Sequence, residues 1–150
     1  MIGAGDSQAA LDGVFIVADE PLLVFQSISD AVAYLEPIDV ENGVYPVAYG
    51  PLGELYRIQT VGGQVIIERV DEPNRPDELR PLLLDYLKNR GAPIASDESI
   101  EVLARRVLLD DQAFWAERDP FGDRFGTRIP SWSCLVVLGM MAVVAYLLLR

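Results

Sequence analysis

Residues 44–70 read VYPVAYGPLGELYRIQTVGGQVIIERV, three apolar runs separated by turn-forming residues. The runs are rich in residues that favour strands, and they cover positions 44–49, 54–61 and 64–70. Pro51-Leu52-Gly53 separates the first two runs, and Gly62-Gly63 is the kind of pair that closes a tight two-residue hairpin. The stretch therefore predicts a three-stranded antiparallel meander.

A second hairpin is expected before the meander. Residues 14–18 (VFIVA) and 22–26 (LLVFQ) are short apolar runs separated by a turn-like tripeptide that ends in proline. Ser29 is a candidate N-cap for a short helix that ends before Pro37, because the residue before a proline avoids helical geometry. Residues 39–43 (DVENG) then read as a turn-rich link.

Two longer helices are predicted after the meander. Pro81 suits a first turn, so the first of them is expected to begin near Glu78 or Leu79 and to stop at Gly91. Its apolar residues recur at helical spacing at Leu79, Leu82, Leu83, Tyr86 and Leu87. Ser96 is the expected cap of the next helix, whose stripe comprises Ile100, Leu103, Ala104, Val107 and Leu108 and extends towards Phe114 and Trp115.

The predicted element order is β-β-α-β-β-β-α-α. This order indicates an α+β domain over residues 14–118, with one small antiparallel sheet and helices packed on one face. Residues 1–13 are small, polar and Gly-rich and are expected to form a flexible start. Residues 119–130 (DPFGDRFGTRIP) are expected to link the domain to the segment that follows.

That following segment, residues 131–149, reads SWSCLVVLGMMAVVAYLLL and holds no charged residue. A helix of this length rises roughly 28 Å, close to the hydrocarbon thickness of a bilayer. Trp132 and Tyr146 lie near opposite ends, where aromatic rings favour the membrane interface, and Arg150 can reach lipid head groups. We therefore expect one C-terminal transmembrane helix in a lipid bilayer; the alternative is a buried helix of a soluble core.

The expected topology keeps the globular domain in the cytoplasm. The first residues lack the basic and apolar regions of a signal peptide. Arg124 and Arg128 precede the span and only Arg150 follows it, so the positive-inside bias favours a cytoplasmic domain. The arrangement resembles that of a single-pass, tail-anchored protein. Homodimerisation through the span is a further option, because small residues recur along one side at Gly139, Ala142 and Ala145.

The chain is strongly acidic, with 12 basic and 23 acidic residues and a formal net charge of −11. Residues 121–150 hold three Arg and one Asp, so residues 1–120 carry a net charge of −13. A domain with this charge repels nucleic acid and attracts a basic protein surface. The alternative is that the acidity only keeps the domain soluble.

Catalytic signatures are missing from the sequence. There is no His, so Ser–His–Asp and Cys–His arrangements are excluded, and the single Cys134 permits no intrachain disulfide. No phosphate-binding glycine loop is present. Paired acids such as Asp71-Glu72 are frequent by composition, and residues 39–43 lack the spacing of a calcium loop. We therefore expect no enzyme activity, no cofactor and no metal site.

Aromatic residues within the acidic sequence, which we expect to be exposed, are the better candidates for binding. Tyrosines fall on the meander and have acids or turns beside them, a combination that suits the capture of a basic protein. The candidate binding residues are Tyr45, Tyr49, Tyr56, Glu41 and Glu54. The alternative is that the three rings pack between a strand and a helix.

Three segments resemble the small immunity proteins of bacterial polymorphic and contact-delivered toxin systems. They are LLVFQSISDAVAYLEPIDVENGVYPVAYG (22–50), LGELYRIQ (52–59) and DELRPLLLDYLKNRG (77–91). The resemblance is one of overall pattern within residues 22–91. It implies a non-catalytic inhibitor that binds and blocks one cognate toxin through an acidic surface.

Three functions are therefore left open. The leading hypothesis is a membrane-anchored binding module of the immunity type. The second is a tail-anchored adaptor or structural subunit of a membrane protein complex, which the apolar span alone suggests. The third is a hydrolase that uses a carboxylate-bound metal.

Overall fold

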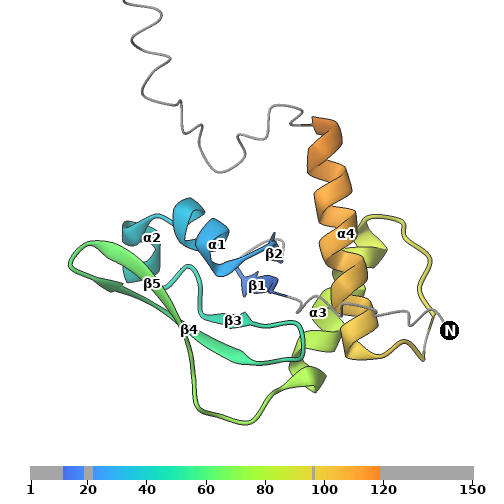
Figure 1. The fold of residues 1–150 in the computed structure, drawn as a ribbon, viewed down its shortest axis with the longest axis horizontal. Helices are drawn as coiled ribbons and strands as arrows, with labels where there is room; N and C mark the ends of the chain where they lie inside the picture. Colours follow the sequence, from blue (N-terminus) through green and yellow to red (C-terminus); the bar gives the residue numbers. More distant parts are fainter. Residues whose placement is uncertain (1–11, 19–21, 96, 119–150) are drawn as a thin grey trace, which may run out of the picture.

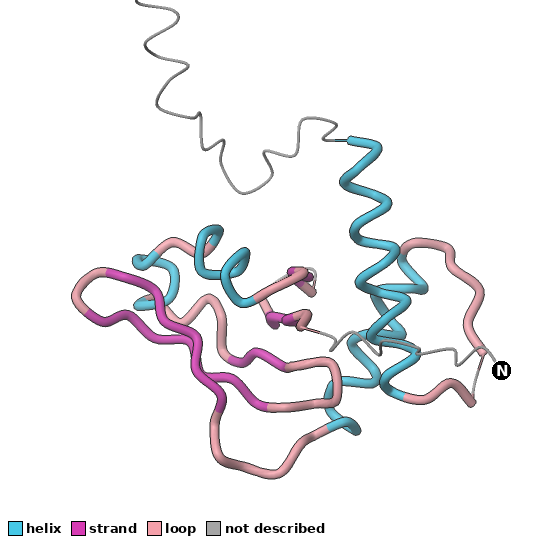
Figure 2. The backbone as a smooth tube through the Cα atoms, viewed as in Figure 1, coloured by secondary structure: helices cyan, strands magenta, loops and turns pink. Residues whose placement is uncertain are grey.

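The computed structural model describes residues 12–18, 22–95 and 97–118, which form an α+β domain with one antiparallel sheet (Figures 1 and 2). The strands are β1 (Val14–Val17), β2 (Leu23–Phe25), β3 (Val47–Tyr49), β4 (Leu55–Val61) and β5 (Gln64–Arg69). The helices are α1 (Ile28–Tyr34), α2 (Pro37–Glu41), α3 (Pro76–Asn89) and α4 (Ile100–Arg118).

The strand order in the sheet is β2-β1-β3-β4-β5, and every neighbouring pair is antiparallel. The predicted first hairpin and the predicted meander are both present. Gly62 and Gly63 have φ angles of 59° and 77°. Residues with a side chain rarely adopt such positive angles, and a two-residue hairpin turn requires them. The two halves of the sheet join where Phe15 of β1 pairs with Tyr49 of β3.

Helices pack on both faces of the sheet, so the expectation of a single covered face is wrong. Along β1, Phe15 belongs to the core cluster that includes α3 and α4 residues, whereas Val14 and Ile16 belong to the cluster that includes α1 residues. Figure 1 shows the pair α1 and α2 and the pair α3 and α4 on different sides of β1. An uninterrupted apolar strand is the expected consequence of burial on two faces.

The region between the two hairpins is more helical than the sequence suggested. Ser27, not Ser29, is the N-cap of α1, and its hydroxyl accepts a hydrogen bond from the Asp30 N–H at 3.2 Å. The predicted link at 39–43 is largely the short helix α2, which begins with Pro37 because proline suits the first helical position. The strand predicted from residue 44 begins only at Val47.

Both long helices begin at positions other than those predicted. The first-turn proline of α3 is Pro76, while Pro81 lies inside the helix and removes one backbone hydrogen bond there. Gly91 follows the end of α3 with a φ of 71°, as its role as a stop requires. Helix α4 begins at Ile100, where the Ser99 hydroxyl accepts from the Val102 N–H. The predicted cap Ser96 lies outside the described residues.

Several expectations concern parts of the chain that the structure does not describe. They are the flexible start, apart from residues 12 and 13, the linker at 119–130, and the transmembrane helix at 131–149 with Trp132, Tyr146 and Arg150. Within residues 12–18, 22–95 and 97–118, no helix has the length and apolar character needed to cross a membrane.

Candidate binding surface

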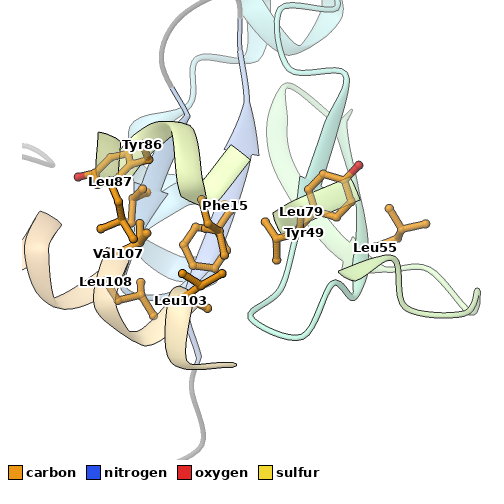
Figure 3. Close-up of a cluster of buried hydrophobic side chains, with 12 residues drawn as sticks. Phe15, Tyr49, Leu55, Leu79, Tyr86, Leu87, Leu103, Val107 and Leu108 are labelled. Carbon is orange, nitrogen blue, oxygen red and sulfur yellow. The ribbon is translucent and has the colours of Figure 1, made fainter. Parts of the chain in front are cut away.

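Tyr49 is not a surface residue, so the expectation that its ring is exposed is wrong. It is only 4% exposed and lies in the core cluster between the sheet and α3, near Leu79 (Figure 3). Its hydroxyl donates to Oε2 of Glu78 at 2.8 Å. Burial, with the hydrogen bond to Glu78, raises the pKa of Tyr49 to about 12. For Tyr49 the alternative given above, a ring packed between a strand and a helix, is the one that the structure shows.

Glu41 is the last residue of α2, and Tyr45 contacts the same helix at Asp39. The Tyr45 ring is partly buried against the α1-side core, and its hydroxyl points at Oδ2 of Asp39, 3.5 Å away. Burial raises the pKa of Tyr45, and the negative charge of Asp39 adds to the effect. Glu41 is exposed on α2 and accepts a hydrogen bond from the Thr60 hydroxyl of β4 at 3.2 Å.

Tyr56 and Glu54 border a separate, open cavity of about 340 Å³. The cavity lies where the turn before β4 meets the start of α1, and it is lined by Asp12, Gly13, Ser27, Ile28, Ser29, Pro51, Glu54 and Tyr56. Oε2 of Glu54 accepts the Leu52 N–H at 2.8 Å, which fixes the carboxylate at the turn. Burial and then the charge of Glu54 raise the pKa of Tyr56.

The residues before Arg57 include no Lys or Arg. The described residues of this stretch carry six carboxylates that we call the acidic face. Asp30, Glu36, Asp39 and Glu41 lie on α1, on α2 or between them, and Asp12 and Glu54 line the cavity at the start of α1. None of the six forms an ion pair within the described residues, where all the ion pairs join groups between 72 and 118. The net charge of the chain does not show that the acidic residues before Arg57 are separated in sequence from all basic residues. The position of Arg57 as the first basic residue would have indicated it.

A second cavity, of about 320 Å³, lies between β2, α1, α3 and α4 and was not anticipated from the sequence. Its lining is mostly apolar: Leu22, Leu23, Val24, Tyr34, Tyr86, Arg90, Asp111 and Trp115. Asp111 is only 2% exposed, and its Oδ1 accepts a hydrogen bond from the Tyr86 hydroxyl at 3.2 Å. A buried carboxylate needs such donors because its desolvation is costly.

Arg90 closes the polar side of this cavity. Its Nη2 donates to the Tyr86 hydroxyl at 2.9 Å, and its Nε lies 3.7 Å from Oδ2 of Asp110. The guanidinium also stacks on the Phe114 ring, with Cζ 3.4 Å from the ring centroid. The charge of Arg90 is therefore balanced by Asp110, and the cavity does not add an unpaired cation to this side of the molecule.

Tyr86 gives the domain a measurable sensitivity to alkaline pH. Burial and then the charge of Asp111 raise its pKa from 10.0 to about 12. The folded state thus holds the phenolic proton more tightly than the unfolded state, so this stability is complete below pH 10 and is lost as the pH rises towards 12. We expect the melting temperature of Tyr86→Phe, followed by circular dichroism, to fall less steeply than that of the unmodified chain over this interval.

At neutral pH the same variant should melt at a lower temperature, because Asp111 loses a hydrogen-bond donor. Tyr49→Phe is the matched comparison for this loss at neutral pH. The pKa of Tyr49 is also raised to about 12, but its hydrogen-bond partner Glu78 is exposed to solvent, whereas Asp111 is buried. Parallel melting profiles for Tyr86→Phe and the unmodified chain between pH 8 and 12 would contradict this account of Tyr86.

Within the described residues, no group of three or more His, Cys, Asp or Glu side chains is placed to hold a metal ion. Comparison with protein-family models, curated proteins and solved structures gives no match for the chain. The resemblance to immunity proteins and the expected lack of catalysis therefore stay predictions.

Proposed function

We propose that this chain is a non-catalytic binding module that holds a basic protein on its acidic face. The observation that supports the proposal is that none of the six carboxylates of that face has an ion-pair partner within the part of the chain that the structure describes. Carboxylates without paired cations produce a negative potential, which speeds encounter with positive surfaces and disfavours wrong partners. Tyr45, beside Asp39, adds aromatic contact area to the same face.

The second part of the proposal is a membrane tether at residues 131–149. The supporting observation is the length and apolar character of this segment, together with Trp132, Tyr146 and Arg150 at its ends. Arg124 and Arg128 on its N-terminal side favour a cytoplasmic domain. A tether would keep the module at the membrane, and its small residues could also pair two copies of the chain.

Among membrane-tethered binding modules, an immunity-type inhibitor fits these features best. Such a protein needs no catalytic group and blocks its toxin through electrostatic complementarity, which an acidic face supplies. The alternative is a tail-anchored adaptor or structural subunit of a membrane protein complex. The apolar segment favours that alternative, because an adaptor also needs a membrane position and a binding face.

Growth protection tests the inhibitor proposal directly. Each neighbouring gene is expressed alone in a bacterial host and then together with the full chain, and growth is recorded. We expect one neighbour to stop growth and the chain to restore it. If no neighbour is toxic, or if the chain gives no protection, the inhibitor proposal fails. Stable co-purification with several membrane proteins in detergent would then favour the adaptor.

A further inference from the structure

Tyr34 places the mostly apolar cavity beside the acidic face. Tyr34 is 44% exposed and lines the cavity, and its ring centroid lies 5.4 Å from that of Phe25. Tyr34 and Glu36 also lie close enough to Tyr45 to raise its pKa, after the larger effects of burial and Asp39. Tyr34 therefore joins the two features: it lines the cavity, and the carboxylates of Glu36 at the α2 N-cap and Asp39 on α2 follow it closely in the chain.

The cavity has the size and lining of an anchor pocket. About 320 Å³ is at the lower end of the range for ligand pockets, roughly 300–1,000 Å³, so it suits one large side chain better than a cofactor. Its apolar lining comes from Leu22, Leu23 and Val24 at β2 and from Trp115 of α4. Protein interfaces gain most of their binding energy from a few such pockets that receive a single large side chain.

We infer that this cavity is the anchor pocket of the acidic face and accepts one large apolar side chain of a basic partner. Lysine or arginine residues on either side of that anchor would meet Glu36 and Asp39. The partner's chemistry follows from charge complementarity, since no carboxylate of the acidic face is ion-paired within residues 12–18, 22–95 and 97–118. The inference rests on the proposed function and adds the residue type and the place where it binds.

Two short peptides test the pocket separately from the acidic face. The probes are Lys-Lys-Phe-Lys-Lys and Lys-Lys-Ala-Lys-Lys, both acetylated and amidated, which have the same charge and differ in the anchor. The full chain is placed in phosphatidylcholine nanodiscs, whose neutral lipid does not attract lysine. Trp132→Phe leaves Trp115 as the single tryptophan, so a 5-fluorotryptophan label reports on the cavity by ¹⁹F NMR.

We expect the phenylalanine peptide to bind at least about tenfold more tightly than the alanine peptide and to shift the Trp115 signal. Equal affinities without a shift would overturn the pocket and leave the acidic face as the binding surface. Failure of both peptides to bind at about 5 mM, enough to detect a Kd near 1 mM, would overturn the pocket and the proposed acidic-face function together.

A cavity-filling variant supplies the matched control. Leu22→Phe narrows the cavity and should reduce the affinity for the phenylalanine peptide to that for the alanine peptide. Leu52→Phe makes the same change at a site that is 43% exposed and outside the cavity, and should leave both affinities unchanged. Melting curves check that both variants fold. A further variant, Tyr34→Ala, removes part of the cavity lining and should weaken the binding of the phenylalanine peptide only. A preserved difference between the peptides in both Leu22→Phe and Tyr34→Ala would overturn the inference.

Discussion

Replacing Phe15 with alanine is expected to destabilise the domain by about 3–5 kcal/mol, the range for removing a buried aromatic ring. Phe15 is 0% exposed on β1, and its strand pairs with both β2 and β3. Figure 3 shows its ring among core side chains of α3 and α4, including Leu79 and Leu103. Domains of this size are stable by only about 5–15 kcal/mol, so the variant should be near its unfolding threshold.

Urea denaturation followed by circular dichroism measures this effect on the full chain in detergent. Leu52→Ala is the control, because Leu52 is exposed and should change the free energy of unfolding by less than about 0.5 kcal/mol. A cost below about 1 kcal/mol for Phe15→Ala would mean that β1 is not the strand on which both layers of helices depend.

The strands were predictable because their signals are local. A glycine pair closes the β4–β5 hairpin, and short apolar runs give the remaining strands within a few residues. The pairing of β1 with β3 is long-range, and no local sequence pattern in either strand indicates it. The run VFIV did contain the evidence for two covered faces, since Val14, Phe15 and Ile16 are all apolar and all buried.

The candidate site was predicted only in part for a related reason. Nearness in the sequence brings Tyr45 to Asp39, but strand alternation and the position of α3 decide that Tyr49 is buried. The apolar cavity joins residues from four elements, which no local pattern brings together. One signal was available: Asp111 continues the inward stripe of α4 after Ala104, Val107 and Leu108, where a carboxylate is unusual.

Reversing three charges of the acidic face is expected to remove function without unfolding the domain. The variant is Glu36→Lys, Asp39→Lys, Glu41→Lys, and it should bind the phenylalanine peptide about 100-fold more weakly and lose growth protection. Attraction to lysine becomes repulsion at the mouth of the cavity. The fold should persist, because the side-chain hydrogen bonds that these three residues make to other described residues are the long one of Asp39 with Tyr45 and the exposed one of Glu41 with Thr60.

A control with the same change in net charge separates the surface from the overall charge. Asp71→Lys, Asp85→Lys, Asp97→Lys reverses three exposed acids outside the acidic face. If both triple variants lose binding equally, only net charge matters and the acidic face is not the site. Added salt gives an independent check, since screening at about 0.5 M should weaken the unmodified chain far more than the acidic-face variant. A selective loss would show that the position of the carboxylates, and not their number, determines binding.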